Sequence, residues 1–265
     1  MDGVERAGPV AESTARILML PYGGGGASAY RALAAELPAA IEGCPLQPPG
    51  REERVSEEPI AELDALVDEV VLVARSLGPE PLALYGHSLG ALVGYHAALR
   101  LEAEGRSIRS LFVGAFTAPQ RPNTWLFENL PRLHRAGFSH VPSPRAPNAG
   151  KVAQLLLGGE EALAIARDSP QLLDRVVPVL LADFRIVDRY RHPAHTPKLR
   201  CPIVAFGGEA DARVPAEDLA AWAELGAGGF TRHDVPGDHF FLRDAGARAR
   251  LVEAMLGAFP EVACS

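Results

Sequence analysis

Cysteine is scarce in this 265-residue chain, basic charge is not in excess, and long apolar runs are missing. The three cysteines (Cys44, Cys201 and Cys264) lie far apart and in no metal-ligand spacing, so we expect neither a disulfide framework nor a zinc site. A net charge of −7 argues against a general nucleic-acid binder. No segment approaches the roughly 20 apolar residues that span a bilayer, and the first residues lack a signal-peptide pattern. These absences predict a cytoplasmic protein that binds neither nucleic acid nor membrane.

A nucleotide-binding loop is also missing, although four consecutive glycines stand at residues 23–26. No Gly-Lys-Ser or Gly-Lys-Thr sequence follows them, as a P-loop requires. The Gly-x-Gly-x-x-Gly spacing with a downstream acidic residue, typical of dinucleotide-binding folds, is absent too. Four glycines in a row cannot pack a core, but they let the backbone approach another group closely or expose its N–H groups.

Apolar segments that resemble strands alternate with helical patterns along the chain. The strand-like segments are RILMLP (16–21), PLALYG (81–86), SLFVGAF (110–116), CPIVAFGG (201–208) and FTRHDVPG (230–237). Helical patterns lie at 59–77, after residue 88 and at 170–191. This alternation predicts one α/β domain over residues 15–265, with a mostly parallel sheet and helices on both faces. Residues 1–14 are polar and aperiodic, and we expect them to be disordered.

The alternation stops from Thr117 to about Ser169, where prolines and isolated aromatic residues replace it. A connection of this length between two core strands is usually an active-site lid. We therefore predict a helical lid insertion at about 117–170. Between Thr117 and Lys151 the segment carries five basic residues against Glu128 alone, which suggests a surface that attracts an acidic partner or is simply solvated.

The segment YGHSLGALVG (85–94) holds a serine between two glycines, at the point where a buried strand gives way to a helix. A nucleophile elbow requires this order of strand, sharp turn and helix, because the strained turn lifts the hydroxyl above the sheet edge. The flanking Gly86 and Gly90 meet the need for small neighbours. Ser88 is therefore the predicted nucleophile, in an α/β-hydrolase fold.

A serine nucleophile needs a histidine base and an acid that orients the base, and in this fold they follow in the order Ser, Asp or Glu, His. His239, on a turn after the last strand, is the predicted base. The acid should follow the preceding strand, and Asp211 is the best candidate. Glu209 and Asp238 remain alternatives.

The oxyanion hole of this fold combines the amide after the nucleophile with an amide from a loop after an early strand. Leu89 supplies the first candidate N–H. Among the glycines at residues 23–26, Gly23 is the favoured donor of the second N–H.

The chain as a whole resembles the type II thioesterases, stand-alone hydrolases that accompany polyketide and nonribosomal peptide synthases. The resemblance rests on LPYGGGGASAYRALAAELP, PPGREERVSEEP, YGHSLGALVGYHAA, PVLLADFRIVDRY, FGGEADARV and PGDHFFL, in family order. It implies a triad of Ser88, Asp211 and His239, oxyanion amides at Gly23 and Leu89, and no metal or organic cofactor.

The resemblance also implies the substrate: an acyl thioester on the phosphopantetheine arm of an acyl or peptidyl carrier protein. Hydrolysis through an acyl-serine intermediate would edit or release chains during biosynthesis. The first loop departs from the usual Pro-His-Ala-Gly-Gly, and Leu89 replaces the usual Met, so acyl specificity cannot be carried over. Dedicated product release, acyl transfer and a catalytically silent binding module remain alternatives.

Overall fold

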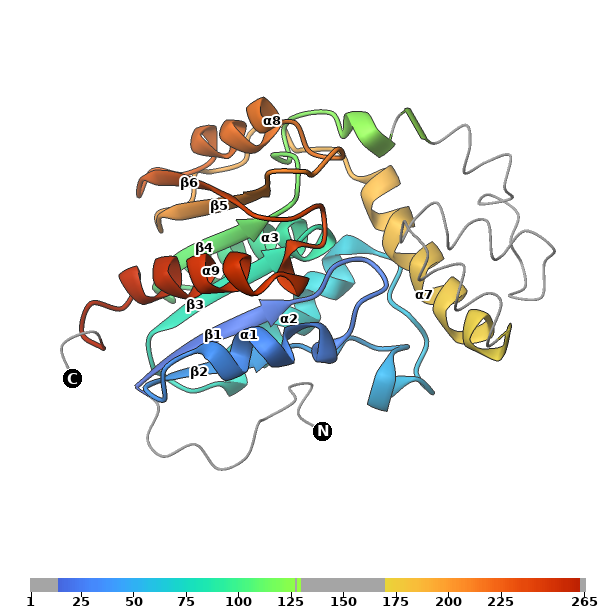
Figure 1. The fold of residues 1–265 in the computed structure, drawn as a ribbon, viewed down its shortest axis with the longest axis horizontal. Coiled ribbons are helices and arrows are strands. Elements are labelled where there is room, and N and C mark those ends of the chain that lie inside the picture. The colour runs from blue at the N-terminus through green and yellow to red at the C-terminus, as the bar shows by residue number, and fades with distance from the viewer. Residues whose placement is uncertain (1–13, 127, 130–169, 263–265) are drawn as a thin grey trace.

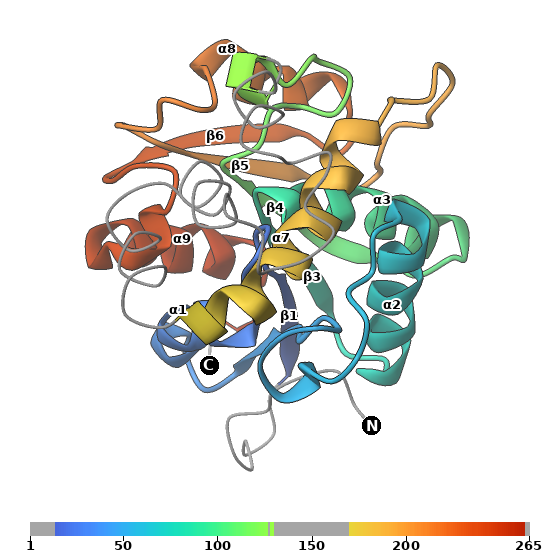
Figure 2. The same ribbon diagram turned by 90° about the vertical axis from the view of Figure 1, so that its right-hand side faces the viewer.

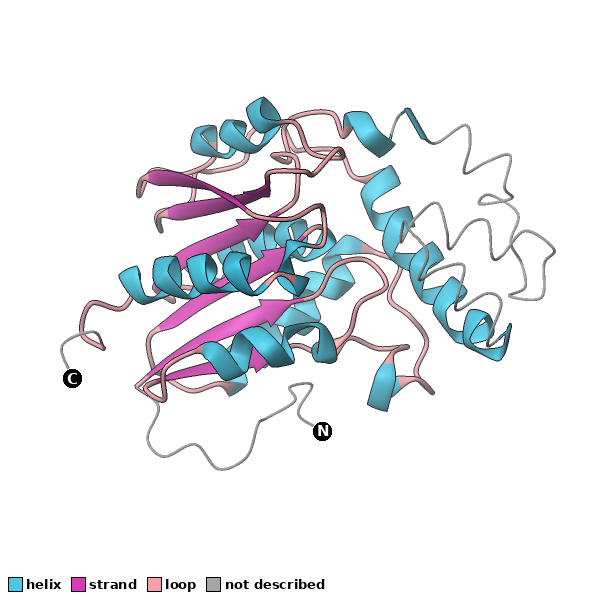
Figure 3. Cartoon of the chain, in the orientation of Figure 1, coloured by secondary structure: helices cyan, strands magenta, loops and turns pink. Residues whose placement is uncertain are grey.

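The computed structural model describes residues 14–126, 128–129 and 170–262. Within these residues, six strands form one parallel sheet in the order β2-β1-β3-β4-β5-β6. Their bounds are β1 Ala15–Leu20, β2 Ile41–Pro45, β3 Leu82–His87, β4 Ile108–Gly114, β5 Ile203–Gly208 and β6 Phe230–Val235. The predicted α/β fold with a parallel sheet is confirmed (Figures 1 and 3).

Helices cover both faces of the sheet (Figure 2). On one face lie α2 (Leu63–Ser76) and α3 (Leu89–Ala103), and on the other lie α1 (Arg31–Glu36) and α9 (Ala245–Gly257). Each face has its own buried apolar cluster, one built around α2 and α3 and one around α1 and α9. The short α8 (Ala216–Ala220) connects β5 to β6.

Five of the six strands correspond to apolar segments of the sequence, but the edge strand β2 was not predicted. Its sequence, IEGCP, contains Gly43 and Pro45 and shows neither an apolar run nor a strict alternation. Pairing with β1 makes it a strand, because the Ala15–Ile41 to Met19–Pro45 register gives its backbone a partner. An edge position tolerates a proline that a central strand would not.

A long helix, α7 (Pro170–Arg189), lies across the carboxyl ends of the strands (Figure 1). It corresponds to the predicted helix at 170–191. The larger part of the predicted lid, residues 130–169, lies outside the described residues, as do residues 1–13. Among the helices that are described, none is long and apolar enough to cross a membrane.

The order of the strands reverses beside β1, since the chain passes from β1 to β2 on one side and then returns to β3 on the other. Loops that leave the carboxyl ends of neighbouring strands diverge at such a point and leave a crevice between them. The glycine-rich loop after β1 and the turn after β3 meet at this edge, beneath α7. The fold thus brings the predicted site residues to one end of the sheet.

Candidate active site

Ser88 stands in a sharp turn between β3 and α3, with a backbone φ of 53°. Such a positive φ is uncommon for a residue with a side chain and stores strain. A Cβ at Gly86 would lie 2.1 Å from the carbonyl oxygen of Gly90, and one at Gly90 would lie 2.1 Å from that of Leu20. The two glycines therefore allow the turn to pack against the end of β1, as the elbow motif requires.

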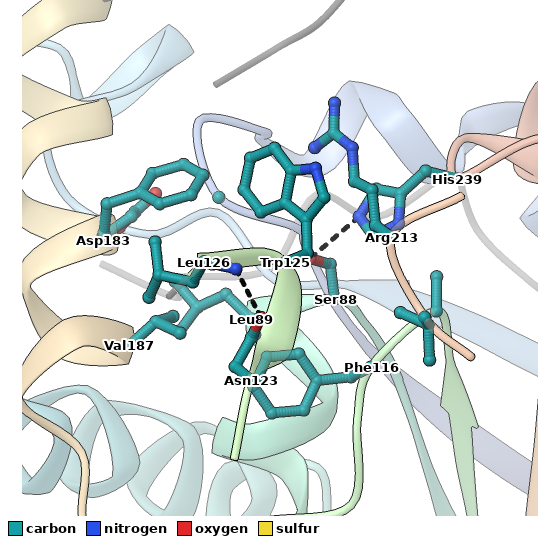
Figure 4. A pocket seen from close by; sticks show the side chains of 14 residues that line it. Ser88, Leu89, Phe116, Asn123, Trp125, Leu126, Asp183, Val187, Arg213 and His239 are labelled. Atoms are coloured by element: carbon teal, nitrogen blue, oxygen red, sulfur yellow. Dashed lines mark hydrogen bonds between the residues drawn. The ribbon is translucent and has the colours of Figure 1, made fainter. Parts of the chain in front are cut away.

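His239 lies between Ser88 and Asp211. Its Nε2 is 3.2 Å from Ser88 Oγ, and its Nδ1 is 3.0 Å from Asp211 Oδ2 (Figure 4 shows the first contact). An ionised carboxylate only accepts hydrogen bonds, so Nδ1 carries the proton and Nε2 is left to accept from the serine hydroxyl. The structure therefore joins Ser88, His239 and Asp211 in a hydrogen-bonded chain, with the imidazole in the tautomer that a general base needs.

The Asp211 carboxylate is almost fully buried and has a second donor in the N–H of Arg213, at 2.8 Å from Oδ1. Burial acts to raise the pKa of Asp211, but the hydrogen bond and the electrostatic interaction with His239 oppose it, and the pKa lies below its ordinary value. Asp211 is therefore ionised at neutral pH and can stabilise a protonated His239.

The two alternative acids lie elsewhere. Asp238 is exposed, and its Oδ1 accepts from the N–H of Phe240 at 2.8 Å rather than from His239. Glu209 is also exposed. Of the three carboxylates considered, only Asp211 makes a described contact with the imidazole.

A pocket opens above Ser88 and His239, and both predicted oxyanion residues, Gly23 and Leu89, line it. Its remaining wall is mainly apolar and comes from the chain after β4, from α7 and from the β5–α8 loop: Ala115, Phe116, Trp125, Leu126, Phe184, Val187 and Val214. Figure 4 shows Leu126 and Val187 on the α7 side of this pocket. An apolar wall beside a nucleophile suits the hydrocarbon part of an acyl group.

Several pocket and support residues lie in the segments that carry the family resemblance, but their side chains were assigned no role from the sequence. Arg213 lines the pocket, with its guanidinium 4.7 Å from the ring of Trp125 and 5.3 Å from that of Phe240. Asp183 of α7 lines it as well. These contacts join residues far apart in the chain, and only the tertiary structure brings them together.

His87 is a further residue whose contact was not predicted. It is fully buried, and its Nε2 lies 2.7 Å from the carbonyl oxygen of His239. A carbonyl can only accept, so His87 donates from Nε2, and its Nδ1 faces the hydroxyl of Tyr85 at 3.3 Å. Burial lowers the pKa of His87 to about 3, which keeps the ring neutral. His87, the residue before Ser88, thereby holds the backbone of His239.

Comparison with known proteins identifies the family of the chain. The family model described as thioesterase domain matches residues 15–257. Gramicidin S biosynthesis protein GrsT of Aneurinibacillus migulanus is 32% identical over 232 residues, which cover 87% of this chain and 84% of the relative. Thioesterase PikA5 of Streptomyces venezuelae is 30% identical over 243 residues, with 91% and 80% covered.

A solved structure extends the similarity to three dimensions. The type II thioesterase BorB from the borrelidin biosynthetic cluster superposes with a TM-score of 0.74 at 29% identity, covering 97% of this chain and 96% of that one. The chain belongs to the thioesterase family, as a serine hydrolase of the α/β-hydrolase fold similar to the type II thioesterases of polyketide and nonribosomal peptide biosynthesis.

Proposed function

We propose that this thioesterase hydrolyses acyl thioesters on the phosphopantetheine arm of acyl or peptidyl carrier proteins, through an acyl-Ser88 intermediate. The observation that carries the proposal is His239, hydrogen-bonded to both Ser88 and Asp211 beside an apolar pocket. The biosynthetic context of the relatives supports the choice of a carrier-bound substrate. A cytoplasmic location, expected from the sequence, remains a prediction.

Acylation begins when Ser88 Oγ attacks the thioester carbonyl and His239 Nε2 takes the hydroxyl proton. The carbonyl π electrons move to oxygen, and the resulting oxyanion is stabilised by the amides of Gly23 and Leu89, each contributing about 3 kcal/mol. Collapse of the tetrahedral intermediate breaks the C–S bond. His239 then returns the proton to the departing thiolate of the arm, which leaves Ser88 acylated.

Deacylation repeats these steps with water. His239 removes a proton from a water molecule, the hydroxide adds to the acyl-Ser88 carbonyl, and collapse releases the carboxylic acid and restores the serine hydroxyl. Asp211 remains ionised throughout and stabilises the imidazolium that forms in each half-reaction. Every proton taken up by His239 is given back, so the cycle needs no group beyond these residues.

Release of incorrect or stalled acyl groups from carriers is the biological task we assign to this reaction. Dedicated release of a finished product, or acyl transfer to an alcohol or amine in place of water, would use the same first step. A panel of carrier proteins loaded with acyl groups of different length distinguishes these possibilities. Editing predicts hydrolysis of many short acyl groups to free acids, whereas product release predicts one preferred long chain, and transfer predicts an ester or amide by mass spectrometry.

A catalytically silent binding module is the alternative from another functional class. A fluorophosphonate probe tests it directly, because the probe reacts only with an activated serine. Labelling of the wild-type chain, and none of Ser88→Ala, supports the enzyme. Absence of labelling in both would favour the binding module.

A further inference from the structure

Three segments that are distant in sequence meet at a buried ion pair beside the active site. Asp183 of α7 is 1% exposed, and Arg51, in the loop after β2, is 8% exposed. Arg51 Nη2 lies 2.5 Å from each of the two Asp183 carboxylate oxygens. Asp183 Oδ2 also accepts a hydrogen bond from the N–H of Gly24, at 2.7 Å. None of the three residues belongs to the Ser88, His239 and Asp211 chain.

A buried ion pair seldom adds net stability, because removing two charges from water costs as much as their attraction returns. Its benefit is more often the fixed geometry that it imposes on its surroundings. Here the ion pair fixes the backbone of the glycine-rich loop. Gly24 follows Gly23 directly, and Gly23 supplies one of the two proposed oxyanion amides.

The glycine-rich loop has no side chains of its own to hold it. Glycine loses more conformational freedom on folding than any other residue, so a loop of four glycines needs anchors from outside. Asp183 provides one such anchor through the N–H of Gly24. It also packs against the loop, since a Cβ at Gly23 would lie 3.6 Å from the Cβ of Asp183 and 3.5 Å from the ring of Phe184.

A second connection runs from the far end of the same loop to Arg51. The N–H of Ala27 donates to Gln47 Oε1 at 2.9 Å, and Gln47 Nε2 donates to the backbone oxygen of Arg51 at 2.9 Å. Gln47 is itself buried. The backbone of Arg51 is thus tied to Ala27 while its side chain holds Asp183, so the two ends of the glycine-rich loop are joined through one hydrogen-bonded network.

We infer that Arg51 and Asp183 are positioning residues that hold the glycine-rich loop in the conformation needed by the oxyanion hole, and that they couple this loop to α7. Figure 4 shows Asp183 on α7 at the edge of the pocket, on the side away from His239. The inference rests on the proposed hydrolysis and on the use of the Gly23 amide in it. Any movement of α7 that shifts Asp183 would then also shift the oxyanion hole.

The expected effect on kcat and KM follows from the chemistry of the oxyanion hole. Its donors interact more strongly with the oxyanion of the transition state than with the carbonyl of the bound substrate. Displacing Gly23 should therefore lower kcat strongly and change KM little. A purely structural role would instead lower stability and leave the kcat of the folded fraction unchanged.

The decisive variant is the double substitution Arg51→Met with Asp183→Leu, which removes both charges and leaves neither one buried alone. Apolar replacement of a buried ion pair is often neutral for stability, so we expect a folded protein whose Tm is lowered only by the loss of the acceptor of the Gly24 N–H. We expect kcat for an acyl-carrier thioester to fall about 100-fold, the effect of losing one oxyanion donor. KM should stay within about threefold, because an oxyanion donor contributes little to binding of the ground-state substrate.

Two single substitutions keep the inference testable if the double variant does not fold. Arg51 contacts both carboxylate oxygens through one nitrogen, so the ammonium of Arg51→Lys can replace it and should keep kcat within about tenfold of the wild type. Asp183→Asn should lose kcat, because the amide has one acceptor oxygen where the carboxylate has two, and its NH2 group would face the Arg51 guanidinium, so the three contacts to Arg51 and Gly24 cannot all be kept. A normal kcat in Asp183→Asn would overturn the inference.

Glu102→Gln is the matched control. Glu102 is another buried carboxylate that accepts backbone N–H groups, those of Arg200 and Cys201 at 2.8 Å each, at the start of β5 and away from the pocket. We expect Glu102→Gln to lower the Tm and to leave kcat within about twofold of the wild type. An equal loss of kcat in this control, or an unchanged kcat in the folded double variant, would refute a specific role for Arg51 and Asp183.

The same assay separates this inference from the proposed function. If the wild-type protein does not hydrolyse acyl-carrier thioesters, the proposed function fails. If the wild type is active and Ser88→Ala is not, while the double variant keeps its kcat, only the positioning role fails.

Discussion

His87 immediately precedes Ser88 in the sequence but supports His239, which lies 152 positions further along the chain. The bond from its Nε2–H to the carbonyl oxygen of His239 fixes the backbone from which this imidazole, the proposed base, projects. We expect His87→Phe to lower the free energy of unfolding by about 1–3 kcal/mol, because a buried carbonyl loses its donor. We also expect kcat to fall about tenfold as His239 gains freedom to move, since small misplacements of a base reduce the rate.

Denaturant unfolding and steady-state kinetics on one preparation measure both effects. His87→Gln serves as the comparison, because its amide can still donate to the carbonyl and should recover part of each loss. Wild-type stability and activity in His87→Phe would show that the bond has no positioning role.

Asp211 gives the second prediction at the scale of single residues. Asp211→Asn should reduce kcat by a factor on the order of 10⁴, because an amide in place of the carboxylate favours the wrong tautomer of His239 and cannot stabilise its charge. Asp238→Asn, next to the base but bonded to the N–H of Phe240, should stay near the wild-type rate. The reverse pattern would assign the role of the acid to Asp238.

Sequence patterns were sufficient to predict Ser88, Asp211 and His239, which hydrogen bonds join in the structure. Each has a local feature in the sequence: glycines flank Ser88, a turn precedes His239, and a strand ends before Asp211. The order Ser, acid, His along the chain, which is typical of this fold, then selects among the candidates. Arg51, Asp183 and His87 lie in segments that carry the family resemblance, but no local pattern assigns them a role. Arg51 and Asp183 are 132 positions apart, so their contact depends on how α7 packs over the loop after β1.

At the scale of elements, α3 and the end of α7 are linked by a partly buried polar contact. Tyr190, directly after α7, places its hydroxyl 3.0 Å from Nε2 of His96 in α3 and 2.9 Å from Nδ1 of His192. Burial, together with the charge of His192, lowers the pKa of His96 to about 4. The folded protein therefore keeps His96 neutral at pH values where the unfolded chain, with a pKa near 6.5, binds a proton.

Low pH should lower the free energy of unfolding through protonation of His96. The stability that a neutral His96 contributes is complete above about pH 6.5 and is lost progressively as the pH falls towards about 4, at up to about 1.4 kcal/mol per pH unit. Urea unfolding from pH 7 to pH 4.5 should show a shallower decline for His96→Gln than for the wild type. Equal slopes would mean that His96 titrates normally in the folded state.

Strands could be predicted from the sequence where their apolar residues form an uninterrupted run. The central strands β1, β3, β4 and β5 are apolar runs buried between two layers of helices, and a continuous run marks such strands. Strand β2 has no such run, and its pairing with β1 could not be deduced from its own five residues. The helix α3 is buried around most of its circumference, so it was recognised from composition and from its position after the elbow rather than from amphipathic periodicity.

At the scale of the whole molecule, charge is distributed unevenly along an acidic chain. The segment from Thr117 to Lys151 has five basic residues and one acidic residue, while the complete chain carries −7. Arg121 is half exposed and already paired with Glu224, whereas Arg132, Arg135 and Arg145 lie outside the described residues. Our hypothesis that this segment attracts an acidic carrier therefore depends on its sequence alone.

Reversal of charge at Arg132 and Arg135 tests the hypothesis. Complementary surface charge mainly raises the association rate and is screened over about 8–10 Å at physiological salt. We expect Arg132→Glu with Arg135→Glu to lower kcat/KM for an acyl-carrier substrate several-fold and to flatten its salt dependence. Hydrolysis of a small acyl thioester without carrier should be nearly unchanged, and an equal loss on both substrates would indicate a structural role instead.

The covalent intermediate is the central claim, and rapid acid quenching followed by intact-mass and peptide mass spectrometry tests it most directly. After mixing with an acyl-carrier thioester, the wild-type protein should gain the mass of the acyl group on the peptide that contains Ser88. Ser88→Ala should remain folded, show no adduct and lose a factor on the order of 10⁴ or more in turnover, since only binding and the oxyanion hole remain. An active Ser88→Ala variant, or an acyl adduct on another residue, would contradict the account.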